Sequence, residues 1–191
     1  MDPARVHQVV LSRLGMKACG TLSPNPTMGR CIVSEGLRMK RLSITPADTV
    51  QFSRIVRGLK FFASMNMVML ERILEGLHFV ECDRGEKVCV QGEVGDTFFV
   101  VQQGSLAVSV RKGRLSWSKK VAALGPGDCF GEMALMFQAP RNATVACRST
   151  SRLFVLTSSH FRAVLDQNPE FAKEITSLAE ARQFELNHRF Y

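Results

Sequence analysis

The middle of the chain, between Phe79 and Leu156, is made of short β-rich runs separated by turns, most of which contain glycine. The runs cover residues 87–90, 97–102, 106–110, 121–124, 143–147 and 153–156. Short strands at such regular spacing are typical of a sandwich or small barrel, in which two sheets share one core. Because 46% of the 191 residues are hydrophobic, the chain has enough apolar side chains for one globular domain with an extension.

Helical patterns flank this β-rich region. Upstream, from Ser64 onward, four aliphatic residues recur at helical spacing, and Gly76 lies near the position expected for a helix cap. These four residues are Leu70, Ile73, Leu74 and Leu77. Downstream, the apolar faces of two more helices consist of Phe161, Val164 and Leu165 and of Phe171, Ile175 and Leu178. Asn168-Pro169 is a signal for the N-cap and first turn of the second of these helices. We therefore expect one helix before the strands and two after them.

The N-terminal segment, residues 1–48, is predicted to be a basic and largely irregular extension, followed by the domain over residues 49–191. It contains four prolines and shows little periodicity beyond a short helical pattern from Val6 to Leu14. Residues 1–60 carry ten Lys or Arg against three Asp or Glu, whereas residues 61–191 carry 15 against 14. Because the cations are scattered and no aromatic residue lies among them before Phe52, we expect no nucleic-acid binding.

Cysteine spacing, hydropathy and missing motifs argue against several further classes of function. The six cysteines show no Cys-x-x-Cys spacing, and the four histidines lie far apart, so we expect no metal site. The cysteines are Cys19, Cys31, Cys82, Cys89, Cys129 and Cys147. No hydrophobic signal sequence opens the chain and no apolar run is long enough to span a bilayer, so we expect a cytoplasmic protein with reduced thiols and no membrane span. No nucleophile with a base, metal triad or phosphate-loop motif is found, so we expect neither enzymatic activity nor a prosthetic group.

Residues 130–144 place a glycine, a carboxylate and an arginine within a dozen positions of one another, in the sequence FGEMALMFQAPRNAT. Free backbone N–H groups at the start of a short helix attract an anion, and the guanidinium of Arg141 can bind phosphate oxygens in pairs. The negative charge of Glu132 would repel a phosphate. Its presence makes sense if the ligand also offers hydroxyl donors, as a ribose does. The ligand implied is therefore a nucleotide.

This segment resembles the phosphate-binding cassette of the cyclic nucleotide-binding domain family, whose pattern is Phe-Gly-Glu-aliphatic-Ala-Leu, a spacer, and Pro-Arg-x-Ala-Thr. The resemblance extends upstream to glycines that fall at the family's turns between its first strands, and it covers roughly residues 58–185. These upstream positions are Gly85-Glu86, Gly92, Gly95-Asp96 and Gly104. Matches at so many spaced positions have a low false-positive risk. The resemblance implies an α+β, mainly β fold: an eight-stranded jelly-roll β-barrel flanked by N-terminal and C-terminal helices.

The resemblance also implies a set of ligand-binding residues, namely Gly131, Glu132, Met133, Ala134, Leu135, Arg141, Asn142 and Ala143. Arg141 would contact the cyclic phosphate, and Glu132 would accept a hydrogen bond from the ribose 2′-hydroxyl. The alternatives are a surface arginine and a glutamate that only stabilises a helix N-terminus. Gly131 would let the backbone approach the ligand, while Ala134 and Leu135 would offer backbone N–H groups. In the family an apolar or aromatic residue of the last helix caps the purine, and the candidates are Phe184, Leu186, Phe190 and Tyr191.

The choice of base depends on Asn142. In the family a Thr or Ser directly after the arginine favours guanine, and Ala is common there in adenine-binding members. Asn both donates and accepts hydrogen bonds, so it could contact a base or face solvent. We expect cyclic AMP, rather than cyclic GMP, as the regulatory ligand.

The sequence is compatible with more than one kind of partner. Lys40-Arg41-Leu42-Ser43-Ile44 resembles the basic-basic-x-Ser-hydrophobic substrate site of cyclic AMP-dependent protein kinase, although such short motifs also occur by chance in basic tails. We expect a sensor in which ligand binding repositions the helices between Ser158 and Asn187 and so regulates a protein partner, with a kinase catalytic subunit as one candidate. The alternatives are a gating module of a channel or transporter, and a barrel that has lost its ligand and serves as an interaction domain.

Overall fold

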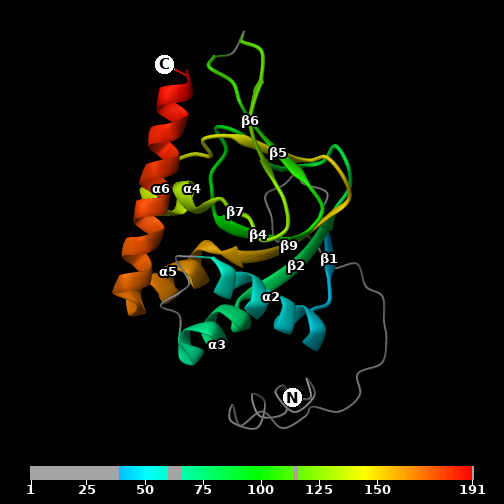
Figure 1. Ribbon diagram of the computed structural model, residues 1–191, viewed down its shortest axis with the longest axis vertical. Coiled ribbons are helices and arrows are strands. Elements are labelled where there is room, and N and C mark those ends of the chain that lie inside the picture. Colours follow the sequence, from blue (N-terminus) through cyan, green and yellow to red (C-terminus); the bar gives the residue numbers. More distant parts are fainter. Residues whose placement is uncertain (1–38, 60–65, 114–115, 191) are drawn as a thin grey trace.

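Two antiparallel sheets flanked by helices make up the computed structural model, which describes residues 39–59, 66–113 and 116–190 (Figure 1). The five-stranded sheet has the order β1 (Lys40–Leu42), β2 (Leu77–Cys82), β9 (Ser151–Thr157), β4 (Thr97–Gln103) and β7 (Cys129–Phe130). The four-stranded sheet has the order β3 (Lys87–Cys89), β8 (Thr144–Cys147), β5 (Leu106–Val110) and β6 (Lys119–Leu124). The prediction of a mainly β fold with flanking helices is therefore confirmed.

The strand count differs from the expected eight, because nine strands are present in the described residues. The additional strand, β1, pairs with β2 in antiparallel register and lies within the segment that was expected to be irregular. The six β-rich runs of the sequence correspond to β3, β4, β5, β6, β8 and β9. The short helical pattern from Val6 to Leu14 lies outside the described residues.

Strands β4 and β9 form the centre of the larger sheet and are buried on both faces. Side chains alternate along a strand, so successive residues of β4 enter different cores. Phe99 and Val101 face the space between the two sheets, whereas Phe98 and Val100 belong to the core between the larger sheet and the helices. Burial on both faces explains why this strand is a nearly continuous hydrophobic run rather than an alternating one.

In the described part of the chain two helices, not one, precede the main strands. The first, α2 (Pro46–Gly58), begins with a capping box in which Thr45 and Asp48 bond to each other's backbone N–H groups, and Pro46 lies in its first turn. The second, α3 (Met67–Glu75), ends at Gly76 as expected. The assignment of Leu77 to this helix was wrong: Leu77 is buried at the start of β2, where it pairs with β9.

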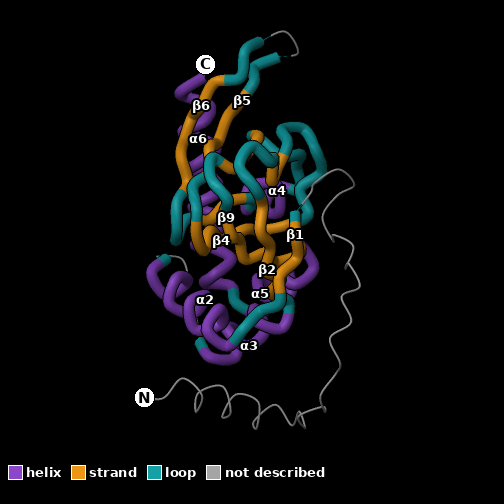
Figure 2. The backbone as a smooth tube through the Cα atoms, turned by 90° about the vertical axis from the view of Figure 1, so that its right-hand side faces the viewer, coloured by secondary structure: helices purple, strands orange, loops and turns teal. Residues whose placement is uncertain are grey.

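The C-terminal helices are α5 (Ser158–Gln167) and α6 (Pro169–Phe190), so the signal at Asn168-Pro169 is confirmed. Figures 1 and 2 show α2, α3 and α5 gathered below the larger sheet, while α6 runs alongside the sheets. Phe161 of α5 stacks on Phe98 of β4, with ring centroids 5.0 Å apart, and meets Phe171 of α6 edge to face. Among the described residues, no helix is both long enough and apolar enough to cross a membrane.

Phe161 joins α5, α6 and β4, so its removal tests the core that holds the C-terminal helices to the sheet. We expect Phe161→Ala to lower the free energy of unfolding by about 3–5 kcal/mol, because a buried aromatic side chain is replaced by a cavity. Phe184→Ala, at a side chain that is 62% exposed, serves as the control and should cost less than about 0.5 kcal/mol. Urea denaturation followed by circular dichroism measures both. Equal losses for the two variants would contradict this account of the core.

Candidate functional site

The second residue of the predicted cassette is a glycine that no other residue could replace without strain. Gly131 lies between β7 and the short helix α4 (Glu132–Phe137), and its φ of 95° is in the left-handed region. A Cβ atom there would lie 2.6 Å from the carbonyl oxygen of Thr97 and 2.8 Å from Nη1 of Arg141. Glycine is therefore required both by the backbone angle and by the space that Arg141 occupies.

Arg141 is buried, with only 7% of its surface exposed. Its Nη2 donates to Oγ1 of Thr97 at 2.8 Å and its Nη1 donates to the carbonyl oxygen of Gly131 at 3.2 Å. The guanidinium also lies 5.7 Å from the ring centroid of Phe99. Within the described residues, no carboxylate is close enough to form an ion pair with it. A buried cation held only by neutral groups leaves a site that favours an anion.

The backbone around Arg141 is fixed by the turn that precedes β4. The N–H of Arg141 donates to the carbonyl of Glu93 at 2.8 Å, and the N–H of Gly92 donates to the carbonyl of Arg141 at 2.9 Å. A Cβ atom on Gly95 would collide with the side chain of Ala134 and would lie 3.1 Å from Nε of Arg141. The close approach of this glycine lets the turn, α4 and the arginine pack together.

Glu132 is almost fully buried, at 1% exposure. Its Oε1 accepts a hydrogen bond from Nη1 of Arg182 in α6 at 2.7 Å, and this ion pair reaches from the cassette to the last helix. The same Nη1 donates to the carbonyl of Cys129 at 3.0 Å. The second carboxylate oxygen, Oε2, is buried and has no hydrogen-bond partner in the described part of the chain. A buried carboxylate oxygen without a donor is costly, so Oε2 points to a ligand that brings a donor.

Asn142 forms a second polar link between the cassette and α6. Its Nδ2 donates to Oε1 of Gln183 at 2.8 Å and also lies 3.9 Å from the sulfur of Met133. Arg182 and Gln183 are neighbours in α6, so one turn of this helix bonds both Glu132 and Asn142.

A cavity of about 220 Å³ opens over these groups. Seven of the eight predicted site residues line it, namely Gly131, Glu132, Met133, Ala134, Arg141, Asn142 and Ala143. Leu135 does not, because its side chain packs into the core between the larger sheet and the helices. The opposite walls come from β5, β6 and β8, and α6 adds Arg182, Glu185 and Leu186. The ligand contacts of all eight residues remain predictions.

Of the four candidates for a base cap, Leu186 lines the cavity. Phe184 is 62% exposed and stacks on His188, with ring centroids 3.8 Å apart. The side chain of Phe190 and all of Tyr191 lie outside the described residues. Sequence reasoning missed Arg182, although Leu178, Arg182 and Leu186 recur every four residues and so share one face of α6.

Two cysteines that line the cavity are uncharged. Burial raises the pKa of the Cys89 thiol to about 11. Burial, followed by the nearby carboxylate of Glu132, raises the pKa of the Cys129 thiol to about 12. Both thiols therefore act as small neutral groups in the cavity that Glu132 and Arg182 also line. In the part of the chain that the structure describes, no group of three His, Cys, Asp or Glu side chains could hold a metal ion.

Comparison with known proteins identifies the domain. Residues 79–168 match the family model of the cyclic nucleotide-binding domain. A cAMP-dependent protein kinase regulatory subunit from Yarrowia lipolytica is 33% identical over 134 residues, which is 66% of this chain and 34% of that protein. A cyclic nucleotide-gated potassium channel from Mesorhizobium japonicum is 32% identical over 136 residues, covering 71% of this chain and 36% of the channel. The chain thus spans about a third of the length of these curated relatives.

Solved structures agree on the fold. The regulatory domain of Toxoplasma gondii PKA with cAMP superposes with a TM-score of 0.62 at 21% identity, over 69% of this chain and 50% of that one. The catabolite activator protein of Thermus thermophilus gives a TM-score of 0.59 at 22% identity, over 68% and 60%. The jelly-roll prediction is confirmed by these likenesses. The family match, the fold and the cassette show that this chain belongs to the cyclic nucleotide-binding domain family.

Proposed function

We propose that the domain is a sensor that binds a cyclic nucleotide in the cavity over α4 and transmits binding through α6. One observation carries this proposal: two groups that lack a full set of partners among the described residues line the same cavity, namely a buried guanidinium without an anion and a buried carboxylate with an unpartnered oxygen. Arg141 supplies the donors that a phosphate needs, and Glu132 supplies the acceptor that a ribose hydroxyl needs. A 3′,5′-cyclic nucleotide leaves the 2′-hydroxyl free and so offers both groups on one rigid sugar.

The proposed binding geometry keeps the existing ion pair. The ribose 2′-hydroxyl donates to Oε2 of Glu132, so that Oε1 stays with Arg182. The phosphate takes donors of Arg141 and backbone N–H groups at Ala134 and Leu135. Both cavity thiols stay neutral, and Glu132 is held by Arg182, so we propose binding without catalysis and no prosthetic group.

We propose cyclic AMP as the preferred ligand. The amide of Asn142 is held by Gln183, and the position carries no hydroxyl of the kind that favours guanine in the family. The neighbouring walls are largely apolar, with Val108, Val121 and Leu124 among the lining residues. The Yarrowia relative is described as cAMP-dependent, which agrees with this choice.

The output of the sensor is proposed to be a movement of α6. A ligand shifts a conformational equilibrium only if it binds two states with different affinity. A ligand that contacts Glu132 and Asn142 acts on the two residues to which Arg182 and Gln183 are bonded, so we expect the bound and free states to differ at α6. The partner that senses this change is proposed to be a protein, and a cytoplasmic location stays a prediction.

A kinase catalytic subunit is one candidate partner, but the serine motif is not presented as a free peptide. Lys40–Leu42 form β1 and pair with β2, and Leu42 and Ile44 pack against the core. Ser43 is exposed between them. The segment could enter a kinase active site only after β1 separates from the sheet, so we propose α6 as the partner-facing element.

A second candidate function is a gating module of a longer channel. The match to the Mesorhizobium channel favours it, since it covers 71% of this chain but 36% of the channel. The ligand site and the role of α6 are the same under both candidates, so the experiments below apply to either.

The ligand is tested by calorimetric titration with cyclic AMP, cyclic GMP and 5′-AMP. We expect cyclic AMP to bind most tightly. Arg141→Ala should weaken binding by about 30- to 3000-fold, because a buried charged pair with the phosphate is lost. The control is Arg152→Ala, which removes an arginine whose side chain is 46% exposed in its pair with Glu81. Thermal melts check that both variants are folded. Unchanged affinity in folded Arg141→Ala would contradict the assignment of Arg141 to the phosphate, whereas no binding of either cyclic nucleotide to wild type would favour an interaction domain.

Glu132 is tested by a double-mutant cycle with the ligand as one partner. Removing the 2′-hydroxyl, with 2′-deoxy cyclic AMP, should weaken binding to wild type by roughly 10- to 100-fold, the worth of a hydrogen bond to a charged group. The same deoxy ligand should lose little further affinity with Glu132→Gln, because the charged acceptor is already gone. If the deoxy ligand lost the same affinity with both proteins, the 2′-hydroxyl would not contact Glu132.

The role of α6 is tested by hydrogen exchange. Cyclic AMP should change the exchange rates of amides in the last turns of α6, around Arg182 and Gln183, while amides of α2 serve as the internal control. Arg182→Ala combined with Gln183→Ala removes both links and should reduce the ligand-induced change in α6, since the helix then no longer senses the cassette. A ligand response confined to α4 would argue against α6 as the output.

A further inference from the structure

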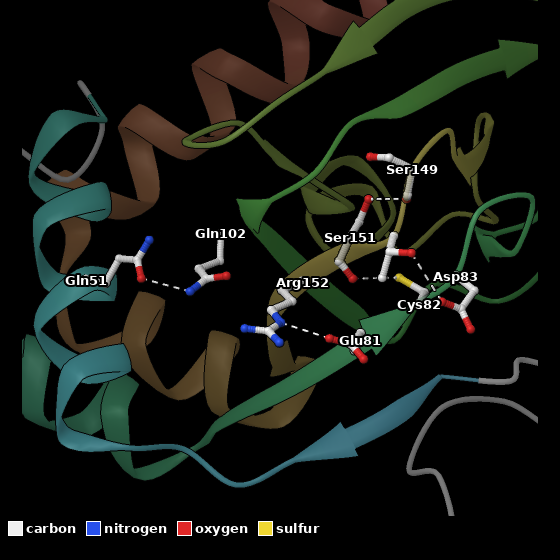
Figure 3. Close-up of polar contacts among 9 residues, drawn as sticks. Gln51, Glu81, Cys82, Asp83, Gln102, Ser149, Ser151 and Arg152 are labelled. Carbon is white, nitrogen blue, oxygen red and sulfur yellow. Dashed lines mark hydrogen bonds and ion pairs between the residues drawn. The ribbon is translucent and has the colours of Figure 1, made fainter.

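Two cysteines that play no part in the nucleotide site meet between the two sheets. Cys82 is the last residue of β2 and Cys147 is the last residue of β8, and their sulfur atoms lie 3.2 Å apart. Both residues are buried, at 1% and 3% exposure. Figure 3 shows Cys82 at the end of its strand, where its thiol also reaches the carbonyl of Ser151 at 3.6 Å. A disulfide needs a sulfur–sulfur distance of about 2.05 Å, so an approach of about 1 Å closes the bond.

The backbone holds the two cysteines in place from both sides. The N–H of Gly85 donates to the carbonyl of Cys147, and the N–H of Cys147 donates to the carbonyl of Glu86, both at 2.8 Å. Cys82 pairs in register with Ser151 of β9. The turn that follows Cys82 is thus bonded directly to Cys147, and these hydrogen bonds hold the two chain segments together.

This pair differs from Cys89 and Cys129, for which no sulfur contact is present among the described residues. The contact between the two sulfur atoms lowers the pKa of Cys147, and the same contact, followed by burial, raises the pKa of Cys82. The thiolate is the form of cysteine that attacks oxidants. Cys147 therefore has the character of the attacking sulfur, and Cys82 that of the resolving one.

Two exposed turns lie directly beside the pair along the chain. Residues 83–85 and residues 148–150 are all exposed, and they follow Cys82 and Cys147 directly. Surface turns of this kind open locally at much lower free energy than the core. Such an opening would uncover the sulfurs while the strands stay paired.

We propose that Cys82 and Cys147 form an oxidisable dithiol, which a hydroperoxide converts into an intrachain disulfide that joins the two sheets. The Cys147 thiolate attacks a peroxide oxygen, the O–O bond breaks, and the other oxygen leaves as an alcohol or water after taking a proton. The resulting sulfenic acid is attacked by Cys82, the S–O bond breaks, and water leaves with the proton of Cys82. The two thiols lose two electrons, and the peroxide gains them.

The disulfide would close a loop from Cys82 to Cys147 that contains the whole cassette. Cross-linking a loop of this length restricts the unfolded chain and stabilises the folded one. We expect the melting temperature of the oxidised protein to exceed that of the reduced protein by about 5–15 °C.

The test treats the full chain with hydrogen peroxide and maps tryptic peptides without reduction. Cleavage leaves Cys82 in peptide 73–84, Cys147 in peptide 142–148, and Cys89 and Cys129 in two other peptides. We expect the peptide 73–84 linked to 142–148, two mass units below the sum of its parts, at roughly tenfold or greater excess over any disulfide that contains Cys89 or Cys129. Reduction should abolish the cross-link and the gain in melting temperature together.

A background of Cys19→Ser and Cys31→Ser removes the two cysteines outside the described residues. In that background Cys147→Ser should abolish the thermal gain on oxidation, whereas Cys89→Ser should retain it. The mapping of the wild type does not depend on any variant folding. Absence of the 73–84 to 142–148 cross-link at peroxide levels that oxidise exposed methionines would overturn the proposal, as would random pairing among the four buried cysteines.

Discussion

Two opposite charges are buried in the same cassette without neutralising each other, and the rest of the site is arranged around that fact. Arg141 is held by the hydroxyl of Thr97 and the carbonyl of Gly131, both neutral. Glu132 takes its cation from α6, through Arg182. Burial of charge is tolerated only where hydrogen bonds replace water. Among the described residues Arg141 has no anionic partner and one oxygen of Glu132 has no donor, and this cost is the basis for proposing a ligand that carries both a phosphate and a hydroxyl.

Strand β4 connects this site to the helical core through three consecutive residues. Thr97 bonds Arg141, Phe98 stacks on Phe161 of α5, and Phe99 lies beneath the guanidinium and stacks on Phe130. Successive side chains of a strand point to opposite faces. The packed side chains of β4 therefore connect Arg141 to the helices. This connection adds to the direct polar contacts of α6 with the cassette.

Local signals in the sequence were enough for much of the fold. Six strands, the cap at Gly76 and the helix start at Asn168-Pro169 could be predicted because each depends on neighbouring residues. Strand β7 has only two residues, and β1 is defined by pairing with a strand that follows 37 residues later in the chain, so neither has a local pattern. Leu77 fits a helical spacing, but pairing with Leu156 places it in β2. The missed helix α2 did carry a signal, since Thr45-Pro46-Ala47-Asp48 is a capping box with proline in the first turn.

The candidate site shows the same division between local and long-range signals. Seven of the eight cassette residues line the cavity and come from one short segment, so a local pattern could place them together, whereas Arg182 reaches Glu132 across 50 residues of sequence. This long-range contact gives α6 an influence that the cassette sequence does not contain. Where a binding-competent state is only partly populated, the apparent affinity falls by that fraction. If α6 transmits binding as proposed, two domains with identical cassettes would respond at different ligand concentrations when their last helices differ at the positions of Arg182 and Gln183.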